Sequence, residues 1–136
     1  MFVDASAIVA ILTRAPDADA LADALEAARS PITSPIAVFE AAADLCRRRH
    51  ATVAEALADV QAFLTIAGVR TVSITGKEAE TALDAFARYG KGGDHPAQLT
   101  PGACFAYAVA RNYRTPLLAT GDGFDKTDIR PAMLSP

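Results

Sequence analysis

Several kinds of residue are scarce in this 136-residue chain, and each shortage argues against a class of site. There are two cysteines, two histidines and no tryptophan, and Cys46 and Cys104 belong to no CxxC motif or Cys/His cluster. Two buried thiols are therefore expected, in place of a disulfide or a zinc site. No apolar run approaches the ~20 residues that a membrane-spanning helix needs. The N-terminus, MFVDAS, lacks the basic segment that begins a signal peptide, which favours a cytoplasmic protein.

An excess of charge of one sign is also absent. The 13 Lys and Arg residues nearly balance the 16 Asp and Glu residues, for a net charge of −3. This balance does not by itself indicate a nucleic-acid-binding protein, so any such role belongs to local patches. Hydrophobic residues make up 51% of the chain, which is ample to bury one core. Length and composition together predict a single domain over residues 1–136.

Hydrophobic periodicity, with proline and glycine as punctuation, predicts alternating helices and short strands. Ser6 is a candidate cap for the first helix, and Phe105 and Tyr107 have the helical spacing of core residues. Predicted helices span 6–14, 17–29, 36–49, 52–67, 77–89 and 101–113, and predicted strands span 1–4, 32–33, 69–75, 115–120 and 126–130. This order predicts an α/β fold with a central, mainly parallel sheet of four to five short strands and helices on both faces.

Two acids directly follow predicted strands. Asp4 comes after the apolar run MFV, and Asp122 lies in TGDGF, after the strand at 115–120. Each alone is typical of a turn or a helix N-cap. Because the carboxyl ends of parallel strands meet at one edge of a sheet, where α/β proteins form their sites, both acids are expected at that edge.

A third acid lies on a helix that is otherwise apolar. Glu40 is found in IAVFEAAA, residues 36–43, where the other seven residues are apolar. A buried carboxylate needs a partner or a metal ion, and the alternative is a surface Glu on an alanine-rich helix. If this helix packs along the edge of the sheet, three carboxylates converge and a cation relieves their repulsion. Oxygen ligands favour Mg²⁺ or Mn²⁺, which commonly serve phosphodiester hydrolysis.

Four stretches, in this order and spacing, resemble the PIN-domain ribonucleases of the VapC toxin type: FVDASAIVAIL, SPIAVFEAAADL, GKGGDHPAQLTPGACFAYAVA and LLATGDGFDKTDI. The resemblance covers nearly the whole chain. It implies a PIN-like fold and a Mg²⁺- or Mn²⁺-dependent endoribonuclease, the toxin of a toxin–antitoxin pair. It also implies that Asp4, Glu40 and Asp122 are catalytic metal ligands. Ser6 falls on the family's small hydroxyl, and Gly123 stands where relatives often carry a polar or acidic residue.

One acid of the family pattern is missing. Relatives typically have GDCFAYALA where this chain has GACFAYAVA, so Ala103 stands where an aspartate is expected. The resemblance therefore implies an impaired enzyme, unless Asp94 or Asp125 supplies the missing carboxylate. The alternative is a catalytically degenerate PIN-fold protein that binds an antitoxin or RNA. A phosphatase-like or receiver-like protein would instead transfer a phosphoryl group to Asp4, but no Lys or Ser/Thr arrangement typical of those sites is found.

The expected partners are RNA and protein. The run RRRH, residues 47–50, either ends a helix favourably or contacts RNA, and Lys77, Arg88 and Lys91 could touch phosphates; no RNA-binding residue is assigned. The Ala- and Leu-rich helices at 17–29 and 52–67 predict an apolar groove that receives a partner helix. The resemblance makes this partner a VapB-like antitoxin, with the chain a homodimer, or a heterotetramer or octamer with the antitoxin.

Overall fold

The computed structural model describes residues 1–121 and 123–133. Its elements are β1 (Phe2–Val3), α1 (Ala5–Leu12), α2 (Ala18–Glu26), β2 (Ile32–Thr33), α3 (Pro35–Arg49), α4 (Val53–Ala67), β3 (Arg70–Thr71), α5 (Gly76–Tyr89), α6 (Pro101–Asn112), β4 (Leu117–Leu118) and the 3₁₀-helix η1 (Phe124–Lys126). Within these residues, no helix combines the length and the hydropathy needed to cross a bilayer.

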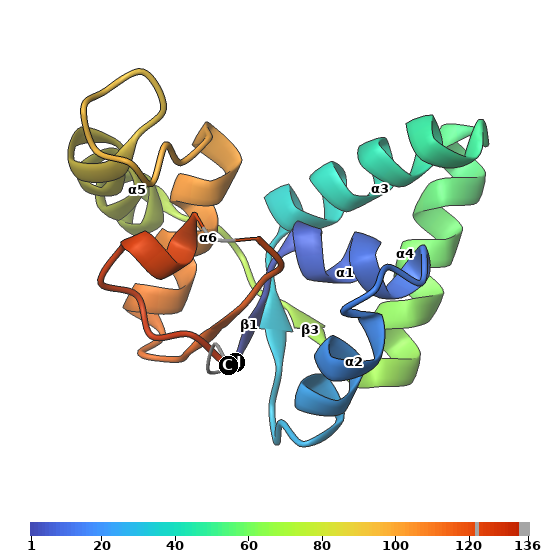
Figure 1. Cartoon of the computed structure of the whole chain (residues 1–136). Coiled ribbons are helices and arrows are strands. Elements are labelled where there is room, and N and C mark those ends of the chain that lie inside the picture. Colours follow the sequence, from blue (N-terminus) through green and yellow to red (C-terminus); the bar gives the residue numbers. More distant parts are fainter. Residues whose placement is uncertain (122, 134–136) are drawn as a thin grey trace.

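The strands form a four-stranded sheet in the order β3-β2-β1-β4. Each of the three pairings is parallel, with Phe2 of β1 in register with Ile32 of β2 on one side and Leu117 of β4 on the other. Figure 1 shows α5 and α6 on one side of the strands and α1, α2, α3 and α4 on the other. The predicted α/β fold, with a parallel sheet between two layers of helices, is confirmed.

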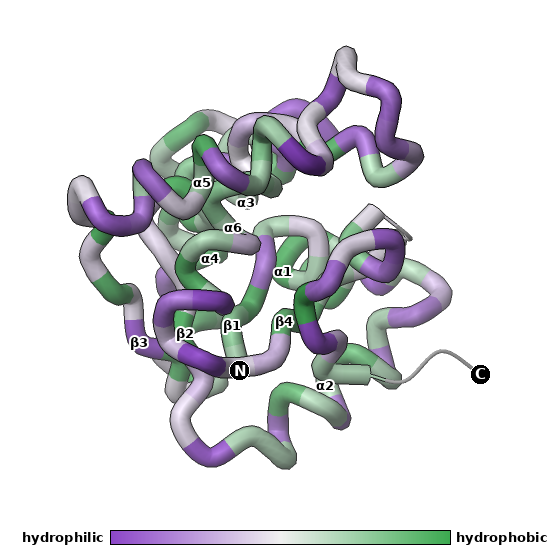
Figure 2. Tube along the Cα trace, turned by 90° about the vertical axis from the view of Figure 1, so that its left-hand side faces the viewer, coloured by the Kyte–Doolittle hydropathy of each residue, from purple (hydrophilic) through white to green (hydrophobic). Residues whose placement is uncertain are grey.

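The central strands do not alternate between polar and apolar residues, because both of their faces are buried in the core. Phe2 and Val3 have no exposed surface, because a parallel strand covered by helices on both faces is apolar throughout. Ile8 of α1, Leu45 of α3 and Tyr107 of α6 are likewise fully buried against the sheet layer. In Figure 2, α1 is mostly hydrophobic, and hydrophilic residues concentrate in the outer turns. The prediction that Tyr107 belongs to the core is confirmed, whereas Phe105 is partly buried.

Helices begin directly after the two central strands because a capping residue follows each strand. Asp4 follows β1 and accepts a hydrogen bond from the backbone of Ser6, so it is the N-cap of α1. The prediction that Ser6 caps this helix is wrong, since Ser6 lies within the first turn. Ser34 follows β2 and caps α3 by accepting from Ala37 N at 3.1 Å. Both helices therefore start at the same, carboxyl edge of the sheet.

Four of the five predicted strands differ from the structure. The strand at 1–4 is shortened to Phe2–Val3, and the strand at 115–120 is shortened to Leu117–Leu118. The strand at 69–75 is reduced to the two residues of β3, because the chain then turns into the capping box of Thr75 and Glu78 that begins α5. The strand at 126–130 is absent. Residues 124–126 form η1, and Thr127 N–H closes a turn on Phe124 O at 3.0 Å, so local hydrogen bonds replace a ladder there.

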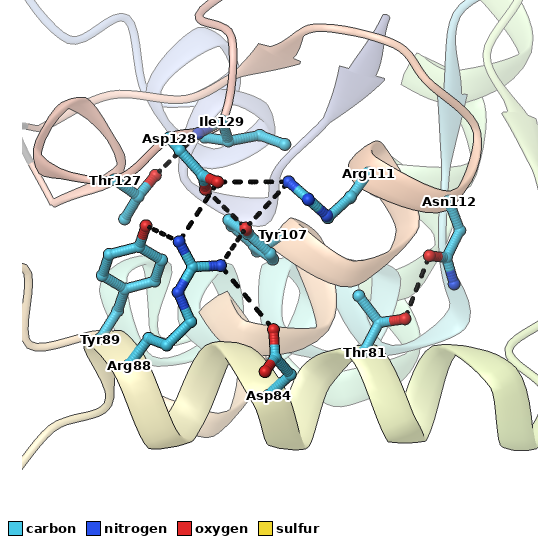
Figure 3. Close-up of polar contacts among 10 residues, drawn as sticks. All are labelled: Thr81, Asp84, Arg88, Tyr89, Tyr107, Arg111, Asn112, Thr127, Asp128 and Ile129. Atoms are coloured by element: carbon cyan, nitrogen blue, oxygen red, sulfur yellow. Dashed lines mark hydrogen bonds and ion pairs between the residues drawn. The ribbon is translucent and has the colours of Figure 1, made fainter.

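A polar cluster holds the C-terminal segment against α5 and α6 (Figure 3). The buried Tyr107 hydroxyl donates to Asp128 Oδ1 at 2.5 Å, and Arg88 and Arg111 each approach Asp128 Oδ2 at 3.3 Å. Burial, and then the hydrogen bond with Asp128, raise the pKa of Tyr107 to about 12. The same hydrogen bond is the largest cause that lowers the pKa of Asp128. One carboxylate thus joins three segments that are distant in sequence.

Candidate active site

Asp4 lies at the carboxyl end of β1 and is 7% exposed. Its Oδ2 accepts hydrogen bonds from Ser6 N at 3.0 Å and from Ser6 Oγ at 2.6 Å. Burial raises the pKa of Asp4, and the Ser6 hydrogen bonds oppose that rise without cancelling it. The carboxylate is therefore held in one orientation at some electrostatic cost.

Glu40 reaches the same edge of the sheet from α3. It is half-buried, and burial raises its pKa, with a further rise from the nearby charge of Asp4. The Glu40 carboxylate lies against Gly102 in the first turn of α6, where a Cβ would overlap it. The glycine in this helix start therefore makes room for the acid. The sequence alternative, a solvated surface Glu, does not describe this position.

Asp4 and Glu40 line one cleft of 430 Å³. Its walls are α1, the face of α3 that runs from Phe39 to Arg47, and the start of α6 at Thr100 and Ala103. The cleft lies beyond the carboxyl end of β1, where an α/β sheet is expected to place its site. Carboxylate and hydroxyl oxygens are the donors gathered here, and such donors suit a hard divalent cation.

Ala103 is in this cleft, in the first turn of α6. Thr100 caps the helix by accepting from Ala103 N at 3.2 Å, and no acidic residue is present in the first turn. The position at which the family pattern leads us to expect an aspartate therefore faces the same space as Asp4 and Glu40. The methyl group of Ala103 supplies no ligand there.

Asp122 lies outside the described residues. Close before it, Thr120 N–H donates to Ser6 Oγ at 3.2 Å, and the Thr120 hydroxyl bonds to Asp17. Thr120 therefore lies beside Ser6, which lines the cleft. Across residues 1–121 and 123–133, no group of three His, Cys, Asp or Glu residues is placed to hold a metal ion. Two of the three predicted acids are brought together, and the third stays a prediction.

Comparison with known proteins decides the family. The PIN domain pattern matches residues 1–130. The chain belongs to the PIN-domain family. It is 38% identical to a VapC ribonuclease of Rhizobium meliloti, over 94% of this chain and 98% of that protein. It is also 36% identical to ribonuclease VapC42 of Mycobacterium tuberculosis, over 97% of this chain and 98% of that protein. By sequence, this PIN-domain chain groups with the VapC ribonucleases.

Solved structures agree on the PIN fold. The toxin VapC20 of Mycobacterium tuberculosis, described as cleaving the sarcin–ricin loop, superposes with a TM-score of 0.74 at 18% identity, over 94% of this chain and 95% of that one. A chain of a toxin–antitoxin complex from Klebsiella pneumoniae superposes with a TM-score of 0.63 at 16% identity, over 90% of this chain and 88% of that one. At these identities the likeness concerns the fold alone.

Asp94 and Asp125 both lie outside the lining of the cleft that contains Ala103. Asp94 is exposed in the loop between α5 and α6. Asp125 lines a second cleft, of 170 Å³, together with Asp17. The described acids that line the cleft are Asp4, Glu40 and Asp44.

Sequence reasoning missed two residues of this cleft, Phe39 and Asp44, whereas Arg47 belongs to the run RRRH that was already considered for RNA contact. The available signal was helical spacing, because positions four and seven residues after Glu40 lie on its face of the helix. The other basic residues singled out as possible phosphate contacts, Lys77, Arg88 and Lys91, lie elsewhere. Arg88 pairs with Asp128, and the exposed Lys77 and Lys91 do not line the cleft.

Proposed function

We propose that this chain is a metal-dependent endoribonuclease, the toxin component of a type II toxin–antitoxin system. The observation that carries the proposal is the meeting of Asp4 and Glu40 in one cleft at the carboxyl edge of a PIN-fold sheet. The names of its relatives, VapC ribonucleases at 36–38% identity over nearly their whole length, support it.

The proposed cofactor is Mg²⁺ or Mn²⁺, held by Asp4 and Glu40 with Asp122 as the third predicted ligand. When bound, the ion would activate water and stabilise negative charge on the phosphate. The raised pKa values of Asp4 and Glu40 support this proposal, since a cation relieves both the burial cost and the mutual repulsion of the two carboxylates. Ser6 orients Asp4 by two hydrogen bonds, and Gly102 leaves room for the Glu40 carboxylate.

The enzyme is proposed to be impaired by Ala103. A site that lacks one carboxylate places its metal ion and water less well, and such sites derive their rate from that placement. The second candidate function is a PIN-fold protein that binds an antitoxin or RNA without cleaving it. The apolar side chain in the cleft at position 103 is the observation that favours it.

The decisive experiment compares the chain with its Ala103→Asp variant on one structured RNA, with Mn²⁺ and with EDTA. We expect slow or absent cleavage by the parent and Mn²⁺-dependent cleavage by Ala103→Asp, together with tighter Mn²⁺ binding in calorimetry. Ala54→Asp is the matched control, since it adds an acid to the exposed first turn of α4, away from the cleft. Equal cleavage by parent and variant would show that Ala103 is not the missing ligand. Metal binding without cleavage by either would favour the binding protein.

The proposed partner is a VapB-like antitoxin, in a complex built on a homodimer, either a heterotetramer or an octamer. Val53 and Ile66 of α4 support a protein partner, since they are 67% and 87% exposed, respectively. The toxin–antitoxin complex from Klebsiella pneumoniae, which holds a chain of the same fold, supports it as well. Light scattering of the chain alone, and mixed with the product of an adjacent reading frame, would measure both assemblies.

A further inference from the structure

The face of α3 that carries Glu40 extends well beyond the pair of acids. Phe39, Glu40, Asp44 and Arg47 all line the 430 Å³ cleft. From Glu40 to Arg47 the helix advances seven residues, or about 10 Å at 1.5 Å per residue. Arg47 therefore starts about two helical turns beyond Glu40 and is placed for another group of a longer ligand.

The three consecutive arginines at the end of α3 have different surroundings. Arg48 pairs with Asp44 at 2.9 Å, and Arg49 pairs with Asp59 at 3.0 Å and also donates to the backbone carbonyl of Leu12. Arg47 is exposed and forms no ion pair or hydrogen bond with any described residue. Because Arg48 already engages Asp44, the acid nearest along the helix does not neutralise Arg47. Arg47 is thus a free cation in a cleft that otherwise carries acids.

At the other end of this face, an aromatic ring is left in solvent. Phe39 is 73% exposed, although it adjoins the half-buried Glu40 and lines the same cleft. Most of this apolar ring faces solvent within the described fold, which is typical of a surface that binds a ligand. The flat face of a nucleobase is a ligand that such a ring accepts.

We propose that Phe39 and Arg47 form a single-stranded RNA subsite along α3. Phe39 stacks on a base beside the phosphate that a metal ion at Asp4 and Glu40 would hold, and Arg47 pairs with a backbone phosphate further along the strand. This inference rests on the proposed ribonuclease function. A nucleic acid strand offers both ligands at once, bases with exposed π-faces and phosphates at a regular spacing, and unpaired bases are the ones free to stack on a side chain.

The test measures binding and does not depend on cleavage. A labelled, unstructured 12-nucleotide RNA is titrated with the chain in EDTA, by fluorescence anisotropy at several salt concentrations. Arg47→Gln should weaken binding and reduce the slope of log K against log salt by about 0.7, the value for one phosphate contact on a single strand. Phe39→Ala should weaken binding about tenfold with the slope unchanged, since stacking releases no counterions. Arg47→Lys should restore the slope.

Matched controls remove the same groups outside the cleft. Arg29→Gln deletes an exposed arginine in the loop before β2, at the opposite edge of the sheet, and Phe86→Ala deletes a half-exposed ring on α5. Neither should alter affinity or slope by more than twofold. Equal effects of Arg47→Gln and Arg29→Gln, or of Phe39→Ala and Phe86→Ala, would overturn the subsite. So would loss of antitoxin binding by the α3 variants while RNA affinity is unchanged.

Failure of the subsite is separable from failure of the nuclease. In the Ala103→Asp background, Arg47→Gln should raise KM with kcat nearly unchanged, because a remote phosphate contact contributes equally to ground state and transition state. Cleavage by Ala103→Asp with KM unaffected by either α3 substitution would reject the subsite alone. If the parent binds no RNA and Ala103→Asp neither binds nor cleaves it, both proposals are wrong.

Discussion

At the scale of the residue, Asp4 combines two roles in one side chain. It caps α1, which requires an oxygen acceptor at that position, and it faces the cleft, where its charge is costly. Both its buried position and the neighbouring Glu40 disfavour the ionised pair in the absence of a cation. The fold therefore keeps a charged group where an uncharged cap of the same shape would serve stability better.

Replacement of Asp4 by Asn should stabilise the metal-free protein. Asn is an equally good N-cap, and Asp4→Asn removes the buried charge, so we expect a melting temperature higher by about 3 °C in EDTA at pH 7. The folded-state pKa of Asp4 is raised, so the gain should shrink as the pH falls through this raised value and should be absent below the ordinary value of 3.8, where the acid is protonated in both states. Calorimetry of unfolding measures this gain.

The exposed Asp94→Asn variant is the control for loss of charge alone and should melt like the parent. Added Mn²⁺ should raise the melting temperature of the parent but not that of Asp4→Asn. A lower or unchanged melting temperature for Asp4→Asn in EDTA would contradict the repulsion between the two acids.

Gly102 fixes the position of Glu40 by lacking a side chain. Because a Cβ at this position overlaps the Glu40 carboxylate, Gly102→Ala should push the carboxylate away and weaken Mn²⁺ binding at least tenfold in calorimetry. Gly76→Ala is the matched control, since Gly76 starts α5 with open space around it. The control should keep its Mn²⁺ affinity. Unchanged affinity in Gly102→Ala would mean that Glu40 does not bind the ion from its present position.

At the scale of the element, α5 and α6 are joined by one acid. Glu78 accepts hydrogen bonds from Thr75 N at 2.9 Å and from Asn112 Nδ2 at 2.9 Å, so it caps the start of α5 and holds the end of α6. The hydrogen bond from Asn112 is the largest cause that lowers the pKa of Glu78. By comparison, the capping box of Thr52 and Glu55 on α4 is exposed and joins no second helix.

Glu78→Ala should therefore destabilise the fold more than Glu55→Ala does. At pH 7 the loss of unfolding free energy should be about 1–2 kcal/mol for Glu78→Ala, from the cap and the interhelical hydrogen bond together. A lowered folded-state pKa gives stability that is present above pH 4.5 and is lost as the pH falls through the folded value. The difference from the parent in urea unfolding should thus narrow in acid. A loss no larger than that of Glu55→Ala would show that the link to Asn112 contributes nothing.

At the scale of the whole molecule, Asp128 fastens the C-terminal segment to both helices of one layer. The three donors come from α5 and α6, while Asp128 itself follows η1 (Figure 3). Beyond Asp128, the described chain meets β4 again at the bridge between Leu117 and Pro131. The described chain is thus held at Thr120 by Ser6 and at Asp128 by Tyr107.

Tyr107→Phe should weaken this attachment in a pH-dependent way. At pH 7 we expect a loss of about 1–2 kcal/mol in unfolding free energy, for one hydrogen bond from a buried hydroxyl to a carboxylate. The folded-state pKa of Tyr107 is raised from 10.0 to about 12, so this contribution is complete below pH 10 and disappears as the pH rises through 12. Urea unfolding of parent and variant should therefore converge at alkaline pH. Tyrosinate absorbance should show a late titration of Tyr107 in the parent that is absent from Tyr107→Phe. A constant difference across this range would contradict the assignment.

The helices and the two cleft acids could be predicted from the sequence, because short stretches of neighbouring residues indicate them. The helices follow from periodic apolar residues with Pro35 and Pro101 at their starts, and Asp4 and Glu40 stand out because each is an acid in an apolar run. Strand lengths were less predictable. The β-branched stretch at 69–75 favours a strand, yet hydrogen bonding to β2 ends after Thr71, and the chain turns into the cap of α5. The hydrogen bond that the Tyr107 hydroxyl donates to Asp128 was likewise unpredictable, because the two residues lie 21 positions apart in sequence.

Composition and periodicity by themselves determined the α/β class of this protein and the edge of the sheet at which Asp4 lies. The resemblance to the VapC ribonucleases identified position 103 as one that lacks an expected acid. Only the tertiary structure decided which side chains share the cleft. The overlap of Glu40 with any side chain at position 102 depends on how α3 packs against α6, and the pairing of Arg49 with Asp59 depends on how α3 packs against α4. Those contacts join residues far apart in the chain, and each depends on the packing angle between helices, which no local pattern of residues specifies.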